Sequence, residues 1–268
     1  FGREQFKYQP YAAQTGTTGN YRSGALADQL AFYNNPTAGV KATAYPFAET
    51  QFEASPLNRV QQQGAPGESW QISGGHTLKT DYGTNAQDEV KLWTINNSDN
   101  GASSGVYLPG KLYKTISKDE NWKLTDIKAG TTEEFKDFEG RVVLKRIWET
   151  DGKSLSTYYV YDDLGNLRYV LPPAVNGNGQ AALSSFDETQ AVFDQFIYGY
   201  RYDGRRRLIE KKLPGKGWEF MVYNKLDQVV LSQDANRRSA NQWLFSKYDA
   251  LGRTVMTGIY ASASNRPS

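Results

Sequence analysis

Tyr248-Asp249-Ala250-Leu251-Gly252-Arg253 is a turn signature between two strand-like segments. An Asp side chain can accept hydrogen bonds from backbone amides two residues on, which starts a turn. Gly252 can adopt a positive φ without the steric penalty of a Cβ atom. Residues 243–248 and 254–257 are rich in aromatic and β-branched side chains, which favour strands. The stretch therefore predicts a β-hairpin closed by a type I turn and a left-handed glycine.

Related stretches recur along the chain, and a recurring unit indicates a repeat architecture. The copies are residues 161–166, 223–228, 202–207, 135–141, which is one residue longer, and a still longer relative at 52–60. They follow at intervals of roughly 20 to 26 residues, apart from a longer interval between Tyr161 and Tyr202. The residues expected to form the turns are Tyr161, Asp162, Gly165, Tyr202, Asp203, Tyr223, Asn224, Tyr248, Asp249, Gly252 and Arg253. We therefore expect a mainly β fold of antiparallel hairpins.

Two short helices are expected beside the strands. Residues 23–33 have apolar side chains at helical spacing, and Asn34-Asn35-Pro36 ends this segment. Ser185-Phe186-Asp187-Glu188 has the form of a capping box, in which two side chains satisfy the first amides of a helix. It predicts a helical insertion over residues 184–197, which accounts for the longer interval between repeats.

The turn stretches resemble the YD repeats of the RHS family, which also includes teneurins and the insecticidal toxin-complex C proteins. Family copies carry Tyr-Asp, two variable residues and Gly-Arg, and residues 248–253 match all four fixed positions. Residues 161–166 match with Asn166 in place of the Arg. The flanking sequence, over most of residues 50–258, is similar to that of RHS-repeat proteins of Bacteroidota.

The resemblance implies strands wound into a curved or spiral antiparallel sheet, which in relatives closes as a shell around a toxic C-terminal segment. It also implies a secreted or cell-surface protein. Related Bacteroidota proteins are often exported across the outer membrane by the type IX secretion system. Shell-forming relatives carry more copies than this chain. Self-cleaving relatives have an Asp-Pro motif after the repeats, and this sequence contains no Asp-Pro dipeptide. We therefore carry over no protease site.

We expect four segments along the chain. They are a lead-in with a strand and the first helix at 1–49, a variant β-repeat region with a loop (96–110) at 50–134, the YD-repeat hairpins with the insertion 184–197 at 135–258, and a tail at 259–268. Phe1-Gly2-Arg3 looks like the end of a turn motif. We therefore expect the chain to be a fragment of a longer polypeptide, the remainder of which is its first partner.

The composition argues against several classes of function. With 31 Lys+Arg and 29 Asp+Glu, the net charge of +2 does not provide the basic surface that binds nucleic acid. The absence of Cys and the single His rule out disulfides, thiolate metal sites and multi-His metal centres within the chain. No apolar run approaches about 18 residues, so we expect no membrane-spanning helix. We also expect no cofactor and no resident metal.

Two stretches match catalytic or nucleotide-binding patterns only in form. Residues 101–105 have Gly-x-Ser-x-Gly spacing, but a nucleophile elbow requires a strand, a helix and a later His, whereas His76 lies upstream. We interpret this stretch as a flexible loop. Residues 105–111 approach a phosphate-binding loop, but Leu112 replaces the Ser or Thr that would hold magnesium. The sequence therefore gives no support for an enzyme.

The remaining polar clusters have structural interpretations. Residues 96–101 resemble the first half of a calcium loop only imperfectly, and Asp162-Asp163 is interpreted as part of a turn. Glu133-Glu134 is interpreted as a solvated pair, and the basic residues at 205–207 and 211–212 as solvated or ion-paired strand faces. Most Tyr and Trp side chains at strand positions are expected in the core of the sheet.

The sequence as a whole predicts a non-enzymatic structural module. It would display, shield or carry another segment, such as a C-terminal toxin, and be exported as type IX cargo through an outer-membrane complex. The alternative is an adhesion module, in which exposed Tyr and Trp side chains bind surface glycans or a partner protein.

Overall fold

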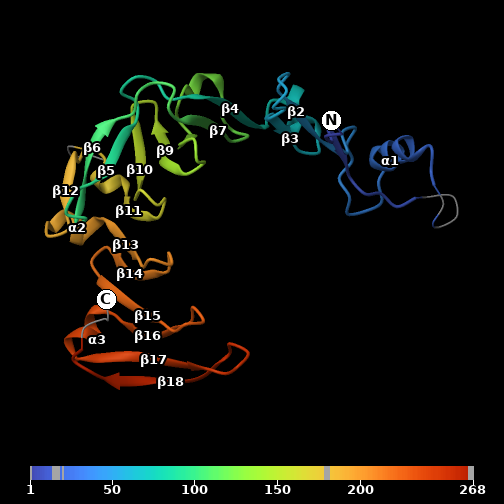
Figure 1. The fold of residues 1–268 in the computed structure, drawn as a ribbon. Helices are drawn as coiled ribbons and strands as arrows, with labels where there is room; N and C mark the ends of the chain where they lie inside the picture. The colour runs from blue at the N-terminus through green and yellow to red at the C-terminus, as the bar shows by residue number, and fades with distance from the viewer. Residues whose placement is uncertain (1, 14–18, 20, 178–181, 265–268) are drawn as a thin grey trace. The chain divides into compact units, whose positions relative to one another are not determined.

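The computed structural model describes residues 2–13, 19, 21–177 and 182–264. Its strands form one large antiparallel sheet and one small sheet of three strands (Figure 1). Across the large sheet the strands are β1 (Phe6–Tyr8), β2 (Phe47–Phe52), β3 (Val60–Gly64), β4 (Leu78–Thr84), β7 (Tyr113–Lys118), β8 (Thr131–Lys136), β9 (Val142–Thr150), β10 (Lys153–Tyr161), β11 (Leu167–Leu171), β13 (Tyr198–Tyr202), β14 (Leu208–Leu213), β15 (Gly217–Tyr223), β16 (Val229–Gln233), β17 (Gln242–Tyr248) and β18 (Thr254–Ala261). Across the small sheet they are β12 (Ser185–Asp187), β6 (Gly101–Val106) and β5 (Lys91–Ile95). The prediction of a mainly β fold on an antiparallel sheet is confirmed.

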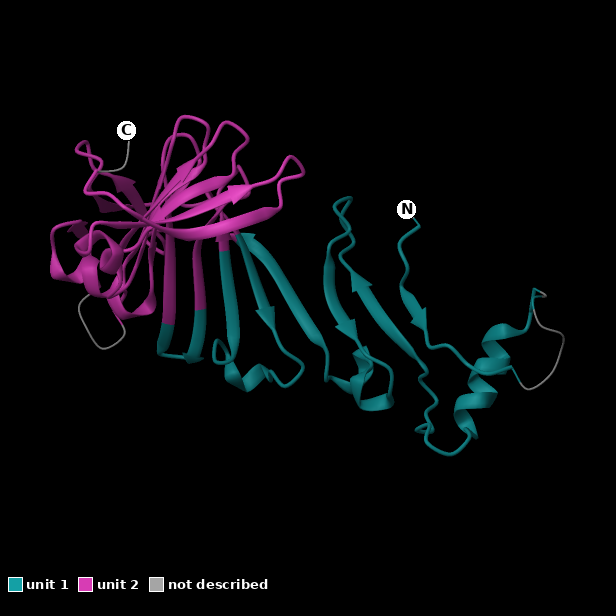
Figure 2. Cartoon of the chain, turned by 90° about the horizontal axis from the view of Figure 1, so that it is seen from below, with its two compact units in different colours: residues 1–83, 114–134, 147–154 teal, residues 84–113, 135–146, 155–268 magenta. Residues whose placement is uncertain are grey.

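The chain divides into two compact units, coloured separately in Figure 2. Unit 1 comprises residues 1–83, 114–134 and 147–154, and unit 2 comprises residues 84–113, 135–146 and 155–268. Unit 1 contains the helix α1 (Ala25–Asn34). Unit 2 contains the small sheet and the helices α2 (Ala191–Phe196) and α3 (Ala235–Ser239). The expected division into four segments stays a prediction.

Four hairpins of unit 2, each closed by one of the recurring turn stretches, share a register shift at the end of the first strand, directly before the turn. The shifts lie at Val160/Tyr161, Arg201/Tyr202, Val222/Tyr223 and Lys247/Tyr248. A bulge of this kind accompanies hairpins that close with a type I turn and a left-handed residue. The bulge before each turn is therefore the one expected for a hairpin with a type I turn and a left-handed residue.

The hydrophobic core of unit 2 joins side chains of the small sheet and α2 to those of β9, β10 and β11. Phe186 of β12 is only 4% exposed, and its ring lies 5.0 Å from Tyr169 in a T-shaped arrangement and 6.0 Å from Phe193 in a stacked one. Aromatic pairs at such separations add to the stabilisation that comes from buried apolar area. The small sheet thus supplies one side of the core.

The helix α1 forms within one to two residues of the expected bounds, yet its apolar side chains do not make a core. Leu26 and Leu30 are 56% and 41% exposed, whereas Gln29 is buried. The amide of Gln29 donates to the carbonyl oxygens of Gln9 at 2.5 Å and Pro46 at 3.2 Å. The buried Gln29 therefore connects α1 to its neighbours through hydrogen bonds.

Two local predictions are wrong, and one short helix was missed. The expected capping box at Ser185 is the strand β12, which pairs with β6, and α2 begins only at Ala191. Residues 101–106, expected within a loop, form β6, where Ala102 is 2% exposed. The helix α3 was not predicted; Asp234 starts it by accepting a hydrogen bond from the amide of Arg237 at 2.8 Å. In the first two cases the deciding contact is a strand pairing between segments far apart in the sequence.

Candidate functional site: the repeated aspartate turns

The turn between β17 and β18 shows how one Asp closes a hairpin. One carboxylate oxygen of Asp249 accepts the amides of Leu251 and Arg253, each at 2.9 Å. The other accepts the Nε of Arg253 at 2.7 Å. The backbone amide of Asp249 donates to the carbonyl of Arg253 at 2.9 Å, and the amide of Gly252 donates to the carbonyl of Asp249 at 3.0 Å. The hydrogen bonds from the Arg253 amide and guanidinium hold the pKa of Asp249 below its usual range.

The same backbone pattern recurs in unit 2, with the residue three places after the Asp or Asn in the left-handed region. The turns begin at Asp137, Asp162, Asp203, Asn224 and Asp249, and the left-handed residues, with φ of 82, 79, 61, 61 and 79°, are Gly140, Gly165, Arg206, Asp227 and Gly252. Counted from Asp137, the first of these turns has the same length as the others, with Lys136 in the position of the Tyr. In the Tyr202 stretch the left-handed residue is Arg206, not Gly204.

The residue four places after the Asp closes each turn with its side chain. The Nε atoms of Arg141 and Arg207 donate to Asp137 and Asp203, each at 2.7 Å, as Arg253 does to Asp249. Asn166 donates to Asp162 at 3.0 Å. In the Asn turn the direction is reversed, because Asn224 Nδ2 donates to Gln228 Oε1 at 2.8 Å. The departures from Arg in the sequence therefore preserve the contact.

Three of the tyrosines that precede a turn connect that turn to the preceding one. The hydroxyl of Tyr161 donates to the carbonyl of Val142 at 2.9 Å, that of Tyr223 to Leu208 at 2.9 Å, and that of Tyr248 to Val229 at 2.8 Å. Each acceptor is the first residue of the strand that leaves the preceding turn. Burial raises the pKa values of Tyr161 and Tyr223, so these hydroxyls remain protonated donors.

Arginine stacking adds to the same connection. The guanidinium of Arg141 lies 5.2 Å from the ring centroid of Tyr161, and that of Arg207 lies 5.0 Å from that of Tyr223. A guanidinium within about 6 Å of an aromatic ring is attracted by the ring's negative face. The turns at Asp137 and Asp162, and those at Asp203 and Asn224, are therefore joined both by a hydroxyl–carbonyl hydrogen bond and by a cation–π contact.

A wider turn in unit 1 uses Glu in place of Asp. Glu53 accepts Arg59 Nε at 2.9 Å and Nη2 at 2.8 Å, while Asn58 takes the left-handed conformation. These hydrogen bonds, led by that from Arg59, lower the pKa of Glu53 to about 2. Tyr82 completes the arrangement, since its hydroxyl donates to the carbonyl of Val60 at 2.9 Å and its ring lies 4.1 Å from the guanidinium of Arg59.

Asn85 forms a further turn of this type that sequence reasoning missed. Its Oδ1 accepts the amides of Lys111 and Leu112 at 2.9 and 2.8 Å. Its own amide donates to the carbonyl of Leu112 at 3.3 Å, and its carbonyl accepts the amide of left-handed Gly110 at 2.9 Å. Asn85 is 2% exposed. The hairpin β5–β6 is inserted into this turn, so no local motif in the sequence marks it.

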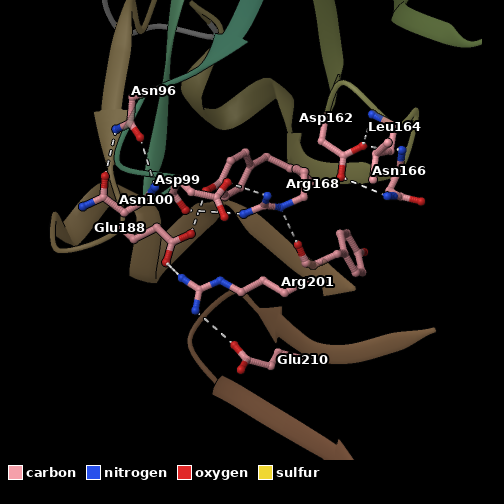
Figure 3. Close-up of polar contacts among 12 residues, drawn as sticks. Asn96, Asp99, Asn100, Asp162, Leu164, Asn166, Arg168, Glu188, Arg201 and Glu210 are labelled. Atoms are coloured by element: carbon pink, nitrogen blue, oxygen red, sulfur yellow. Dashed lines mark hydrogen bonds and ion pairs between the residues drawn. The ribbon is translucent and has the colours of Figure 1, made fainter. Parts of the chain in front are cut away.

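An ion pair between buried Arg168 and exposed Asp99 connects the inserted hairpin to the strands β11 and β13 (Figure 3). The guanidinium of Arg168 donates to Asp99 Oδ1 at 2.6 Å and to the carbonyl of Tyr200 at 2.9 Å, and its side chain is 8% exposed. Asp99 lies in the tip between β5 and β6, where Asn96 accepts the amide of Asn100 at 3.0 Å. The tip, which loosely imitates a calcium loop in sequence, is thus held by its own amides and by Arg168.

Glu188 connects the second insertion to the same two strands, β11 and β13 (Figure 3). It accepts the hydroxyl of Tyr169 at 2.6 Å and the guanidinium of Arg201 at 2.6 Å, and Arg201 also contacts Glu210 at 3.1 Å. The amide of Glu188 donates to the carbonyl of Asn100 at 2.8 Å. Burial, together with the Glu188 carboxylate, raises the pKa of Tyr169. Glu188 thus accepts hydrogen bonds from side chains of β11 and β13 at the same time.

Two charged residues expected on solvated faces are buried. Lys212 is 1% exposed, and its ammonium donates to the carbonyls of Asp194 at 2.5 Å, Ile197 at 3.0 Å and Phe193. These carbonyls lie at the C-terminal end of α2, where a cation is favoured. Glu133 in unit 1 is 3% exposed and lies 3.1 Å from the ammonium of Lys114.

The structure does not assemble the formal catalytic motifs into a site. Ser103 lies within β6, paired with Thr94 and Ser185, so the interpretation as a loop is wrong and the strand–turn–helix geometry of a nucleophile elbow is not formed. His76 belongs to unit 1, where its Nδ1 lies 3.1 Å from the carbonyl oxygen of Glu120. Within the described ranges, no cluster of three or more Asp, Glu or His side chains is arranged to hold a metal ion. The helices of the described residues include none long and apolar enough to cross a membrane.

Comparisons with known proteins give two kinds of match. The family model of a domain of unknown function (DUF6443) matches residues 1–84. The crystal structure of TcdB2-TccC3 without the hypervariable C-terminal region has a TM-score of 0.41 and 14% identity to this chain, and the match covers 83% of this chain and 11% of that one. The crystal structure of TcdB2-TccC3 has a TM-score of 0.42 and 12% identity, and that match covers 80% of this chain and 11% of the other. This chain thus spans only 11% of the length of the solved chains that it matches. No curated protein matches it.

Proposed function

We propose that the chain is a structural module of the RHS or YD-repeat type, which builds a scaffold and catalyses no reaction. The observation that carries this proposal is the connection between turns: the hydroxyls of Tyr161, Tyr223 and Tyr248 each cap the strand that leaves the turn before their own. Contacts of this kind join each repeat to its neighbour, so the array gains stability as units are added. They also satisfy backbone groups at the ends of the strands.

In the longer polypeptide, the scaffold would shield or carry another segment, such as a C-terminal toxin. Export as type IX cargo through an outer-membrane complex would deliver it to the cell surface or the medium. Support comes from the resemblance of residues 161–166 and 248–253 to the repeats of exported RHS proteins.

Limited proteolysis of the full-length protein tests the scaffold role. Asp249→Ala removes the carboxylate that accepts both turn amides and Arg253, so we expect rapid cleavage between β17 and β18 and earlier cleavage of any shielded segment. Asp163→Ala is the matched control, since it removes an exposed carboxylate from a turn that Asp162 holds. Equal cleavage of the two variants would contradict the proposal.

Cell fractionation tests the destination separately. We expect the full-length protein in the medium or on the cell surface, and its retention inside cells that lack the type IX machinery. Unchanged export from those cells would remove the secretion route and leave the scaffold role intact.

An adhesion module is the second candidate function, and one exposed aromatic pair favours it. Tyr113 and Phe138 are 56% and 61% exposed, with ring centroids 5.4 Å apart in a T-shaped arrangement. Exposed aromatic rings can stack on sugars or fill a pocket of a partner protein. Glycan-array binding that is lost in Tyr113→Ala and Phe138→Ala would support this function.

A further inference from the structure

A cleft of about 600 Å³ runs along the strand β5 within unit 2. All the residues of β5, Lys91–Ile95, line it. Further lining residues come from Tyr107, from β10 and from the turns that begin at Asp137 and Asp162. The edge strand of the small sheet therefore forms one wall of the cleft.

The backbone of β5 presents unused hydrogen-bonding groups along one edge. The carbonyl of Val90 accepts Tyr107 and the amide of Asn96 donates to Gly101, so the alternation of an antiparallel ladder directs the even-numbered residues toward β6. The odd-numbered residues Lys91, Trp93 and Ile95 then direct their backbone groups the opposite way. The Lys91 amide lies 3.4 Å from the hydroxyl of Tyr158. The other N–H and C=O groups of this edge have no partner among the described residues, since β5 is the last strand of its sheet.

The charges and one buried donor indicate what would occupy this edge. Five carboxylates but only two cations line the cleft. Arg141 shares its single positive charge between Asp137 and Glu139, at 2.7 and 3.0 Å. The side chain of Glu139 is nevertheless 71% exposed, and Asp163 is exposed. The indole N–H of Trp93, a cleft-lining residue only 8% exposed, has no hydrogen-bond partner within the described part of the chain. An unused strand edge beside excess negative charge suits an extended chain with positive side chains.

We propose that this cleft binds an extended peptide with basic side chains, supplied by a separate polypeptide, which adds to β5 as a fourth strand of the small sheet. Backbone hydrogen bonds to Trp93 and Ile95 would hold the peptide in register, because these residues present both N–H and C=O groups to the edge. The exposed carboxylates of Glu139 and Asp163 would select its lysine or arginine side chains. The inference does not depend on the scaffold role, which rests on the turns.

The test is fluorescence anisotropy with a labelled nine-residue peptide of alternating lysine and valine, titrated with the protein. A peptide of alternating glutamate and valine is the charge control. The backbone control is the same peptide N-methylated at every second residue. It is made in two forms, because methylating the odd-numbered or the even-numbered residues blocks the N–H groups of one or the other edge of the added strand. We expect the basic peptide to bind, the acidic one not to bind, and only one of the two N-methylated forms to lose binding.

Protein variants locate the binding site. Glu139→Gln combined with Asp163→Asn should weaken binding about tenfold at low salt, given about half to one kcal/mol for each surface charge. Glu4→Gln combined with Glu149→Gln removes two charges from residues that do not line the cleft and should leave binding unchanged. Far-UV circular dichroism checks that both variants fold. Undetectable binding of the basic peptide, equal binding of the acidic one, equal effects of the two N-methylated forms, or full binding by the first variant would each overturn the proposal.

Discussion

Unit 2 uses one type of turn to build two regions with different interiors. We call the strands β13 to β18 the hairpin ladder; they follow one another through short turns, and only α3 lies between two of them. The central region, residues 84–113, 135–146 and 155–197, carries two insertions whose strands β6 and β12 pair with each other. All the buried side chains of the hydrophobic cluster belong to the central region. In the ladder, β15 contains only half-buried residues, and β18 is mostly exposed.

The difference shows that the turns and the insertions perform separate tasks. The turns join neighbouring strands, and the same register shift precedes them in both regions. The insertions add a second layer, which removes apolar side chains from water. In the ladder, half-buried aromatic rings are instead covered by arginines: Arg201 lies 4.7 Å from the ring of Trp218, and Arg238 lies 4.5 Å from that of Phe220.

The regions should differ most in how much the removal of an aromatic ring lowers the free energy of unfolding. Phe186→Ala should lower the free energy of unfolding by about 3–5 kcal/mol, because it leaves a cavity between Tyr169 and Phe193. Phe220→Ala in the ladder should cost less than half as much, because solvent already reaches that side chain. Urea unfolding followed by near-UV circular dichroism measures both. Equal costs would show that the second layer does not supply the core.

A smaller loss is expected where a turn requires a left-handed residue. Gly252 has φ +79°, and a Cβ atom there would lie 3.2 Å from Gln228 Nε2. Gly252→Val should therefore lower the free energy of unfolding by about 1–3 kcal/mol, since a β-branched residue is strained at positive φ. Ala250→Val in the same turn is the matched control and should change little. A variant with the melting temperature of the native protein would refute the turn geometry.

The turns could be predicted from the sequence because their contacts are local. Asp249 bonds to residues two to four places away, so the spacing of Asp, Gly and Arg already contains the geometry. Even the copies that lack Arg or Gly obey the same geometry, since Asn166 and Gln228 preserve the closing contact and Arg206 takes the left-handed position.

The second layer could not be predicted in the same way, because its contacts join distant segments. The turn at Asn85 closes on Lys111 and Leu112 only after an inserted hairpin. Ser185 has the local pattern of a helix start, but its pairing with Ser103 makes it a strand. Lys212 looks solvated in a basic run until α2 supplies carbonyl acceptors for its ammonium. Local patterns therefore describe the repeats, and tertiary pairing decides the rest.

Removing the tyrosine hydroxyl that connects two turns should lower the free energy of unfolding by the same amount in both regions. This differs from the effect expected for the aromatic rings. Tyr161→Phe in the central region and Tyr248→Phe in the ladder each remove a hydroxyl that caps a carbonyl, at 2.9 and 2.8 Å. We expect each to lower the free energy of unfolding by about 0.5–1.5 kcal/mol, the range for one lost hydrogen bond. Urea unfolding of the two variants, compared in one buffer, measures the pair. A difference as large as that expected between Phe186→Ala and Phe220→Ala would mean that these tyrosines act through packing.

The smallest effect is a dependence on acid that separates two turns within the ladder. Hydrogen bonds from Arg253 lower the pKa of Asp249 in the folded state, so its stabilising contribution is complete above the usual pKa and is lost as the pH falls through the lowered value. Asn224 holds the preceding turn with an amide that does not titrate, and Asp249→Asn makes the last turn like it. Below about pH 4, the usual value for Asp, the melting temperature of the native protein should therefore fall more steeply than that of Asp249→Asn. Asp163→Asn, at an exposed carboxylate, should follow the native curve; parallel curves for all three proteins would show that the ionised Asp249 adds nothing that an amide does not.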